Sequence, residues 1–146
     1  TKMPDWVNTT FEAYCSRLQS PWNIKLHEIV AQKRPKSANL NTTIQYESQQ
    51  LWQARPANSY TILLERTGVS WNSHQFAAQL AQNFSLGIHV NFIIGGPEGI
   101  DPSYFSQADA LLSLSALTFP HPLVRVMLAE QIYRAWSINS HHPYHR

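Results

Sequence analysis

Short apolar segments alternate with amphipathic segments along this chain, and that alternation limits the possible folds more than any other feature. Compact apolar runs predict buried strands at Tyr60 to Leu64, Ile88 to Ile94 and Ala110 to Leu114. Ile24, Leu26 and Val30 share one face in a period of two, which predicts a half-buried strand over Ile24 to Val30.

Apolar residues between these runs recur at helical spacing. The first predicted helix has Asp5 as its N-cap and ends before Pro21, and the second covers Leu40 to Leu51. The third runs from a Ser73 cap to Gly87. Two more cover Pro102 to Gln107 and Pro122 to Trp136. Alternation of this kind is typical of an α/β fold, with a mostly parallel sheet and helices on both faces. A strand before Thr1 would complete the pattern, so we expect the first strand to be missing from this chain.

Composition excludes several classes of protein. A chain of 146 residues with 43% hydrophobic content predicts one domain over residues 1–146. A net charge of +2 excludes a strongly basic protein that coats nucleic acid, so RNA would have to bind a local basic patch. The run Lys33-Arg34-Pro35-Lys36 is either such a patch or a solvated loop. The single cysteine, Cys15, excludes an internal disulfide. With no signal peptide or membrane span in the sequence, we expect a cytoplasmic protein.

A glycine turn, Gly95-Gly96-Pro97-Glu98-Gly99, directly follows the apolar run Ile88 to Ile94. Ligands of open α/β sheets bind beyond the carboxyl ends of the strands, where glycines let the backbone approach a ligand closely. The spacing matches neither the dinucleotide fingerprint nor a phosphate loop. It is typical of a cofactor loop or of a plain tight turn.

The stretch Leu114-Ser115-Ala116-Leu117-Thr118-Phe119 carries no charge. Its backbone groups could hold an adenine while Leu117 and Phe119 cover the ring, or the stretch could simply be the end of a buried strand. An uncharged loop suits a base better than a phosphate.

The last residues, His142-Pro143-Tyr144-His145-Arg146, combine an aromatic ring with basic groups. Tyr144 could stack on a base, with His145 as proton acceptor and Arg146 and Arg134 as phosphate partners, or the segment could be a frayed end. His141, His142 and His145 lack a further well-placed ligand, so we expect no metal site.

Four segments together resemble one family. They are the segments from Ile94 to Gly99, from Leu114 to Val126 and from Glu130 to Trp136, and the last five residues. The second of them includes His121-Pro122-Leu123-Val124-Arg125. With Lys2-Met3-Pro4-Asp5-Trp6, they are similar to the RlmH-type (YbeA-like) large-subunit ribosomal RNA methyltransferases of the SPOUT class. The resemblance covers essentially the whole chain.

The resemblance implies an α/β fold with a C-terminal trefoil knot, a homodimer without a metal or membrane segment, and S-adenosylmethionine as cofactor. It implies methylation of N3 of a pseudouridine in 23S rRNA on the assembled ribosome. The implied cofactor-binding residues are Leu64, Gly95, Gly96, Leu114, Ser115, Ala116, Leu117, Thr118 and Phe119. The residues implied to meet RNA or complete the catalytic site are Tyr144, His145, Arg146 and Arg134.

The sequence departs from the family pattern in two places. The short apolar strand ending in Val-Gly that usually precedes the Lys-Met-Pro segment is absent, and Glu65-Arg66-Thr67-Gly68-Val69 stands where many members carry an Asp-x-x-Gly-Lys-like run. A SPOUT-class tRNA methyltransferase and a non-catalytic RNA-binding or ribosome-assembly dimer are the alternatives. Removal of the N3 proton could use a neutral His145, or a positive field from Arg134 and Arg146.

Overall fold

The computed structural model describes residues 3–31, 33, 37 and 39–146. The chain forms two compact units. The helical unit comprises Thr1–Leu26, Trp71–Ile88 and Leu117–Arg146, and the sheet unit comprises His27–Ser70 and His89–Ala116. Most of the basic run Lys33 to Lys36 lies outside the described residues, so its role as an RNA patch stays a prediction.

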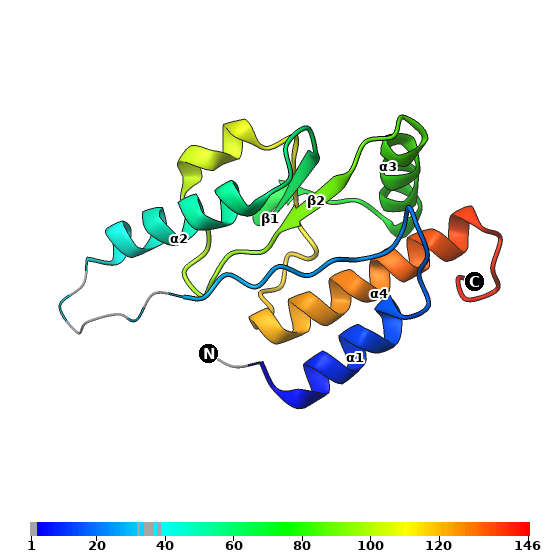
Figure 1. Cartoon of the computed structure of the whole chain (residues 1–146), viewed down its shortest axis with the longest axis horizontal. Helices are drawn as coiled ribbons and strands as arrows, with labels where there is room; N and C mark the ends of the chain where they lie inside the picture. Colours follow the sequence, from blue (N-terminus) through cyan, green and yellow to red (C-terminus); the bar gives the residue numbers. More distant parts are fainter. Residues whose placement is uncertain (1–2, 32, 34–36, 38) are drawn as a thin grey trace. The chain divides into compact units, whose positions relative to one another are not determined.

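In the described residues, the sheet unit is built on three parallel strands in the order β2-β1-β3. They are β1 (Tyr60–Val69), β2 (Val90–Ile93) and β3 (Ala110–Leu112). Figure 1 labels the paired strands β1 and β2. The central strand β1 contributes Ile62 and Leu63, both 0% exposed, because it has a neighbour on each side. The three apolar runs predicted as strands and the parallel α/β architecture are confirmed.

Helix α2 (Leu40–Ala54) and the short 3₁₀ helix η1 (Pro102–Gln107) complete the sheet unit. Both were predicted from the sequence. The side chain of Asn39 caps α2 by accepting from the N–H of Asn41 at 3.0 Å. The hydroxyl of Ser48 accepts from the N–H of Asp101 at 2.8 Å, so α2 is tied to the residue that precedes η1.

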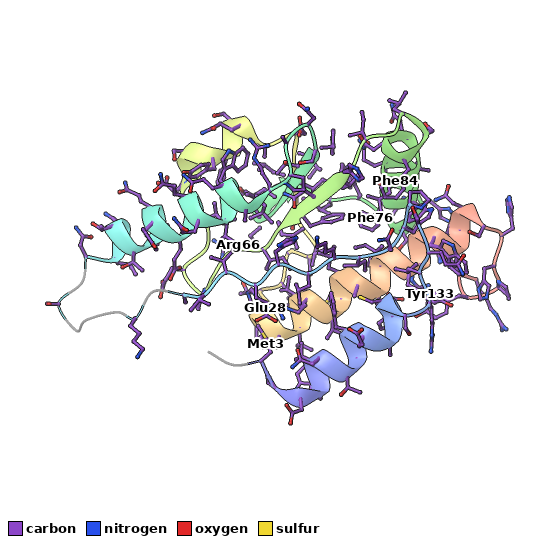
Figure 2. The ribbon with its side chains drawn as sticks, in the orientation of Figure 1. Met3, Glu28, Arg66, Phe76, Phe84 and Tyr133 are labelled. Carbon is purple, nitrogen blue, oxygen red and sulfur yellow. The ribbon has the colours of Figure 1, made fainter. Side chains whose placement is uncertain are left out.

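The helical unit consists of α1 (Asp5–Cys15), α3 (Ser73–Ser85) and α4 (His121–Asn139). Helix α4 packs against both α1 and α3, and Figure 1 shows α1 running beside it. Leu128 and Ile132 of α4 are buried in this core. Figure 2 labels Phe76 and Phe84 on α3; Phe76 is 4% exposed, and the ring of Phe84 meets that of Trp22 edge-on at 4.9 Å.

Helix α3 begins with a capping box one residue before the predicted cap. Asn72 accepts from the N–H of Gln75 at 2.8 Å, and the Gln75 side chain accepts from the N–H of Asn72 at 2.9 Å. Ser73 is not the cap because its hydroxyl donates instead to Oε1 of Gln131 at 2.9 Å. Gly87 follows the helix at φ +70°, as its predicted role as terminator requires.

Two predictions near the start of the chain were wrong. Asp5 is the first residue of α1 rather than its cap, which is Pro4. Residues 24–30 form no helix or strand, and Leu26 and Val30 are 43% and 89% exposed. The physical reason is that a strand needs a paired neighbour, and in the described part of the chain the sheet pairs only β1 with β2 and β3.

Candidate functional site

The carboxyl ends of the three strands bring predicted cofactor residues to one edge of the sheet unit. The register pairs Leu63 with Ile93 and Leu64 with Leu112. Because the strands are parallel, Leu64, Gly95 and Leu114 all follow at the same edge, where ligands of open α/β sheets bind. The structure therefore brings these three predicted residues to one edge of the sheet, and their binding of a cofactor stays a prediction.

The glycine turn beyond β2 is closed by a bridge between Gly96 and Gly99, whose N–H donates to the Gly96 carbonyl at 2.9 Å. Gly99 has φ +82°, a conformation that favours glycine. A Cβ at Gly95 would lie 2.8 Å from the side chain of Ile100, so a larger residue would disturb the turn. The turn is therefore tight, and its role as a cofactor loop stays a prediction.

A buried carboxylate from α2 lies against this turn, and sequence reasoning did not assign it a function. Glu47 is 8% exposed, and its Oε2 is 3.1 Å from the position that a Cβ of Gly96 would occupy. The sequence feature that could have indicated its burial is its position on the apolar stripe of the predicted helix, together with Leu40, Ile44 and Leu51.

The uncharged stretch from Leu114 to Phe119 follows β3 without regular structure. The hydroxyl of Ser113 donates to the carbonyl of Ser115 at 3.0 Å and so fixes the start of the loop. Leu117 is 70% exposed. The boundary between the two units falls after Ala116, so the last three residues of the stretch belong to the helical unit.

Strand β1 bulges between Leu64 and Val69, where it passes the same edge. Thr67 donates to the carboxylate of Glu65 from both its N–H and its hydroxyl. Burial alone would raise the pKa of Glu65, but these hydrogen bonds and the charge of Arg66 leave it below its usual value. Glu65 therefore keeps a negative charge and holds the bulge closed.

The helical unit contains the other predicted site residues. Arg134 donates from Nε and Nη2 to Oε1 of Glu130, at 3.0 and 2.6 Å, and its Nη1 lies 3.1 Å from Nδ1 of His145. The hydroxyl of Tyr144 donates to the same Glu130 oxygen at 3.0 Å. Arg134, Tyr144 and His145 are thus brought together, whereas Arg146 is exposed.

Aromatic contacts anchor the C-terminal segment against α4. Figure 2 labels Tyr133, whose ring lies 4.6 Å from Tyr144 and 5.4 Å from Trp136. The guanidinium of Arg134 lies 5.0 Å from the centre of the Tyr144 ring. Burial, followed by hydrogen bonds with Tyr14 and Glu130, raises the pKa of Tyr144, so its phenol stays a neutral donor. The segment is held in place and is not a frayed end.

A second histidine meets the C-terminal segment, and no local sequence pattern indicated this contact. Nε2 of His74, in the first turn of α3, lies 3.3 Å from Nε2 of His145. Within the described residues, no group of three or more His, Cys, Asp or Glu side chains could hold a metal ion. In that same part of the chain, no helix has the length and apolarity needed to cross a membrane.

Comparison with known proteins shows the family of this chain. A sequence model of the family described as "Predicted SPOUT methyltransferase" matches residues 1–145. The chain is 45% identical over 145 residues to the "Ribosomal RNA large subunit methyltransferase H" of Legionella pneumophila strain Paris, covering 99% of this chain and 93% of that protein. The protein of the same name from strain Lens gives the same identity and coverage. The chain therefore belongs to the SPOUT methyltransferase family, and within it to the RlmH-type group that its sequence resembles.

Proposed function

We propose that this chain uses S-adenosylmethionine to methylate N3 of a pseudouridine in 23S rRNA on the assembled ribosome. The observation that carries the proposal is the 45% identity, over 99% of the chain, to relatives named as large-subunit ribosomal RNA methyltransferases. The RlmH-type resemblance supplies the finer substrate. The family model spans both units, which supports one methyltransferase domain over residues 1–146.

The sheet edge has the chemistry that this cofactor needs. The cofactor, when bound, supplies a methyl group on a positively charged sulfur. The uncharged stretch Leu114 to Phe119 suits its adenosine, because backbone groups and apolar side chains recognise a neutral base. Glu47 beside Gly96 places a carboxylate near the turn, where it favours a positively charged ligand. We propose that Leu64, Gly95 and Gly96, with that stretch, hold the cofactor.

Proton removal from N3 is the step for which the helical unit offers suitable groups. Nδ1 of His145 faces a donor of Arg134, and a guanidinium can only donate. The nitrogen through which a neutral His145 could accept a proton is therefore already engaged. This geometry favours the second alternative, in which Arg134 and Arg146 stabilise the N3 anion, while Tyr144 holds the segment through Glu130.

The trefoil knot, the helices on both faces of the sheet, the homodimer and the cytoplasmic location belong to the same proposal. They are supported by the RlmH-type resemblance and by membership of the family. Recognition of the target would then depend on the dimer surface and on the ribosome.

Transfer of labelled methyl groups tests the proposal. We expect label to pass from S-adenosylmethionine to intact ribosomes in preference to free rRNA or tRNA, and to appear on N3 of a pseudouridine. Label on tRNA alone would indicate the tRNA methyltransferase alternative. Ribosome binding without cofactor binding, measured by calorimetry, would indicate the non-catalytic alternative.

A charge-matched pair of variants tests the role of Arg134. Arg134→Gln should lower the rate of methyl transfer by at least about tenfold, because it removes a positive charge from the site of the developing anion. Lys25→Gln removes an equal charge from an exposed position of the same unit and should leave the rate unchanged. Equal rates for the two variants would exclude the proposed role.

A further inference from the structure

Two imidazole rings meet edge-on where the C-terminal segment passes the start of α3. The rings of His74 and His145 lie 4.9 Å apart at an angle of 85°, and their Nε2 atoms are 3.3 Å apart. The other ring nitrogen of His145, Nδ1, lies 3.1 Å from Nη1 of Arg134. His145 therefore has a polar partner on both of its nitrogens.

One arrangement of protons satisfies all three side chains. Arg134 can only donate, so Nδ1 of His145 must accept, and the single proton of the neutral ring then lies on Nε2. That proton points to Nε2 of His74, which must accept in turn and carry its own proton on Nδ1. Donation runs in one direction, from Arg134 to His145 to His74.

The first turn of α3 also reaches the other partner of Arg134. The hydroxyl of Ser73 donates to Gln131, whose amide donates to Oε2 of Glu130 at 2.8 Å, and Oε1 of Glu130 binds Arg134. Neighbouring residues of α3 thus support both groups that fix the guanidinium. Such chains of hydrogen bonds strengthen one another and limit the orientations of their members.

We propose that His74 is a positioning residue for Arg134, acting through His145. By accepting the Nε2 proton of His145, it leaves Nδ1 as the acceptor that orients the guanidinium toward its place in the reaction. The inference rests on the proposed function, because it assumes that Arg134 serves methyl transfer. His74 contributes an acceptor and is not itself a catalytic residue.

Two substitutions at this exposed position separate the acceptor from other properties of the side chain. His74→Gln keeps an acceptor, its amide oxygen, whereas His74→Lys carries donors only. In the lysine variant both nitrogens of His145 face donors, and no neutral tautomer can satisfy both. The added positive charge would by itself favour RNA binding, so a loss of activity would point to the lost acceptor.

Two measurements on the full chain follow. Long-range proton–nitrogen NMR of histidine-labelled protein, with His145 assigned by comparison with His145→Gln, should show the wild-type ring protonated on Nε2. It should show the same tautomer in His74→Gln and a changed one in His74→Lys. With ribosomes as substrate, kcat/KM should fall about tenfold in His74→Lys, roughly the loss of one charge-assisted hydrogen bond, and stay within about twofold in His74→Gln.

The outcomes separate this inference from the proposed function. A wild-type His145 protonated on Nδ1, an unchanged tautomer in His74→Lys, or full activity of that variant would overturn the role of His74. The expected NMR result without methyl transfer by the wild type would uphold the hydrogen-bond chain and overturn the proposed function. Unchanged thermal unfolding and cofactor binding in both variants would show that the loss is local.

Discussion

Replacing Gly68 by alanine tests the path of β1 along the edge of the candidate cofactor site. A Cβ at this position would lie 2.4 Å from the carbonyl oxygen of Leu111 and 2.8 Å from the nitrogen of Leu112. Both are backbone atoms of β3, which cannot turn aside as the end of a side chain can. Since Cβ atoms essentially never lie within 3.0 Å of such atoms, the two strands would have to separate.

The cost of that separation follows from the contacts at the bulge. The N–H of Ser113 donates to the carbonyl of Val69 at 2.9 Å, and a shift of about half an ångström would stretch it beyond the range of a good hydrogen bond. Overpacking costs about 1 to 3 kcal/mol, and the loss of the bond adds about 1 kcal/mol. We therefore expect Gly68→Ala to lower the free energy of unfolding by about 2 to 4 kcal/mol.

Urea unfolding of Gly68→Ala and of a matched control measures this effect. Gly87 has φ +70° and no heavy atom within 4 Å of its missing Cβ, so Gly87→Ala adds backbone strain without a clash. That strain, offset by the stiffer unfolded chain, should cost about 1 kcal/mol. If Gly68→Ala cost no more than Gly87→Ala, β1 would not run against β3 at the bulge, and the assembly of the sheet edge would be refuted.

Two further variants test the glycine turn of the sheet unit and the C-terminal segment of the helical unit. Gly96→Ala would place a Cβ 3.1 Å from Oε2 of Glu47, so we expect the calorimetric Kd for S-adenosylmethionine to rise about three- to tenfold; an unchanged Kd would contradict the cofactor role of the turn. Burial, then hydrogen bonds with Tyr14 and Glu130, raise the pKa of Tyr144, so its phenol stays neutral when the unfolded chain ionises near pH 10. The stability it contributes is complete below about pH 10 and is lost as pH rises above that value. Tyr144→Phe should therefore flatten the alkaline decline in the free energy of unfolding, and an equally steep decline would contradict this coupling.

The sequence predicted strands well where burial itself produced the pattern. The run Tyr60 to Leu64 is largely apolar, and Thr61, Ile62 and Leu63 are all buried in β1, the central strand of the sheet. The alternation over Ile24 to Val30 is locally as strong, yet no strand forms there. A period of two shows which side chains would share a face, but pairing depends on residues far away in the chain. The same limit hid the bulge, because the contact of Gly68 with Leu111 depends on where β3 lies.

Glu47 shows a different limit at the cofactor edge. Its place on an apolar helical stripe indicated burial, and burial is what the structure shows at 8% exposure. Its neighbour could not be predicted, because the approach of α2 to Gly96 depends on the packing of the sheet unit. Because Glu47 also lies beside the predicted cofactor turn, it is worth testing as a ligand group.

The C-terminal segment shows the same contrast more sharply. Sequence reasoning grouped Tyr144, His145 and Arg134 as residues typical of RNA contacts, and the structure brings the three side chains together. It left open whether the segment was ordered, since the order comes from Glu130 and from aromatic contacts that have no local pattern. His74 lies 71 positions before His145 and meets it only because α3 packs against α4. If the proposed chain from Arg134 to His74 holds, a substitution that removes the acceptor at His74 will lower methyl transfer, although this residue lies far from Arg134 in the sequence.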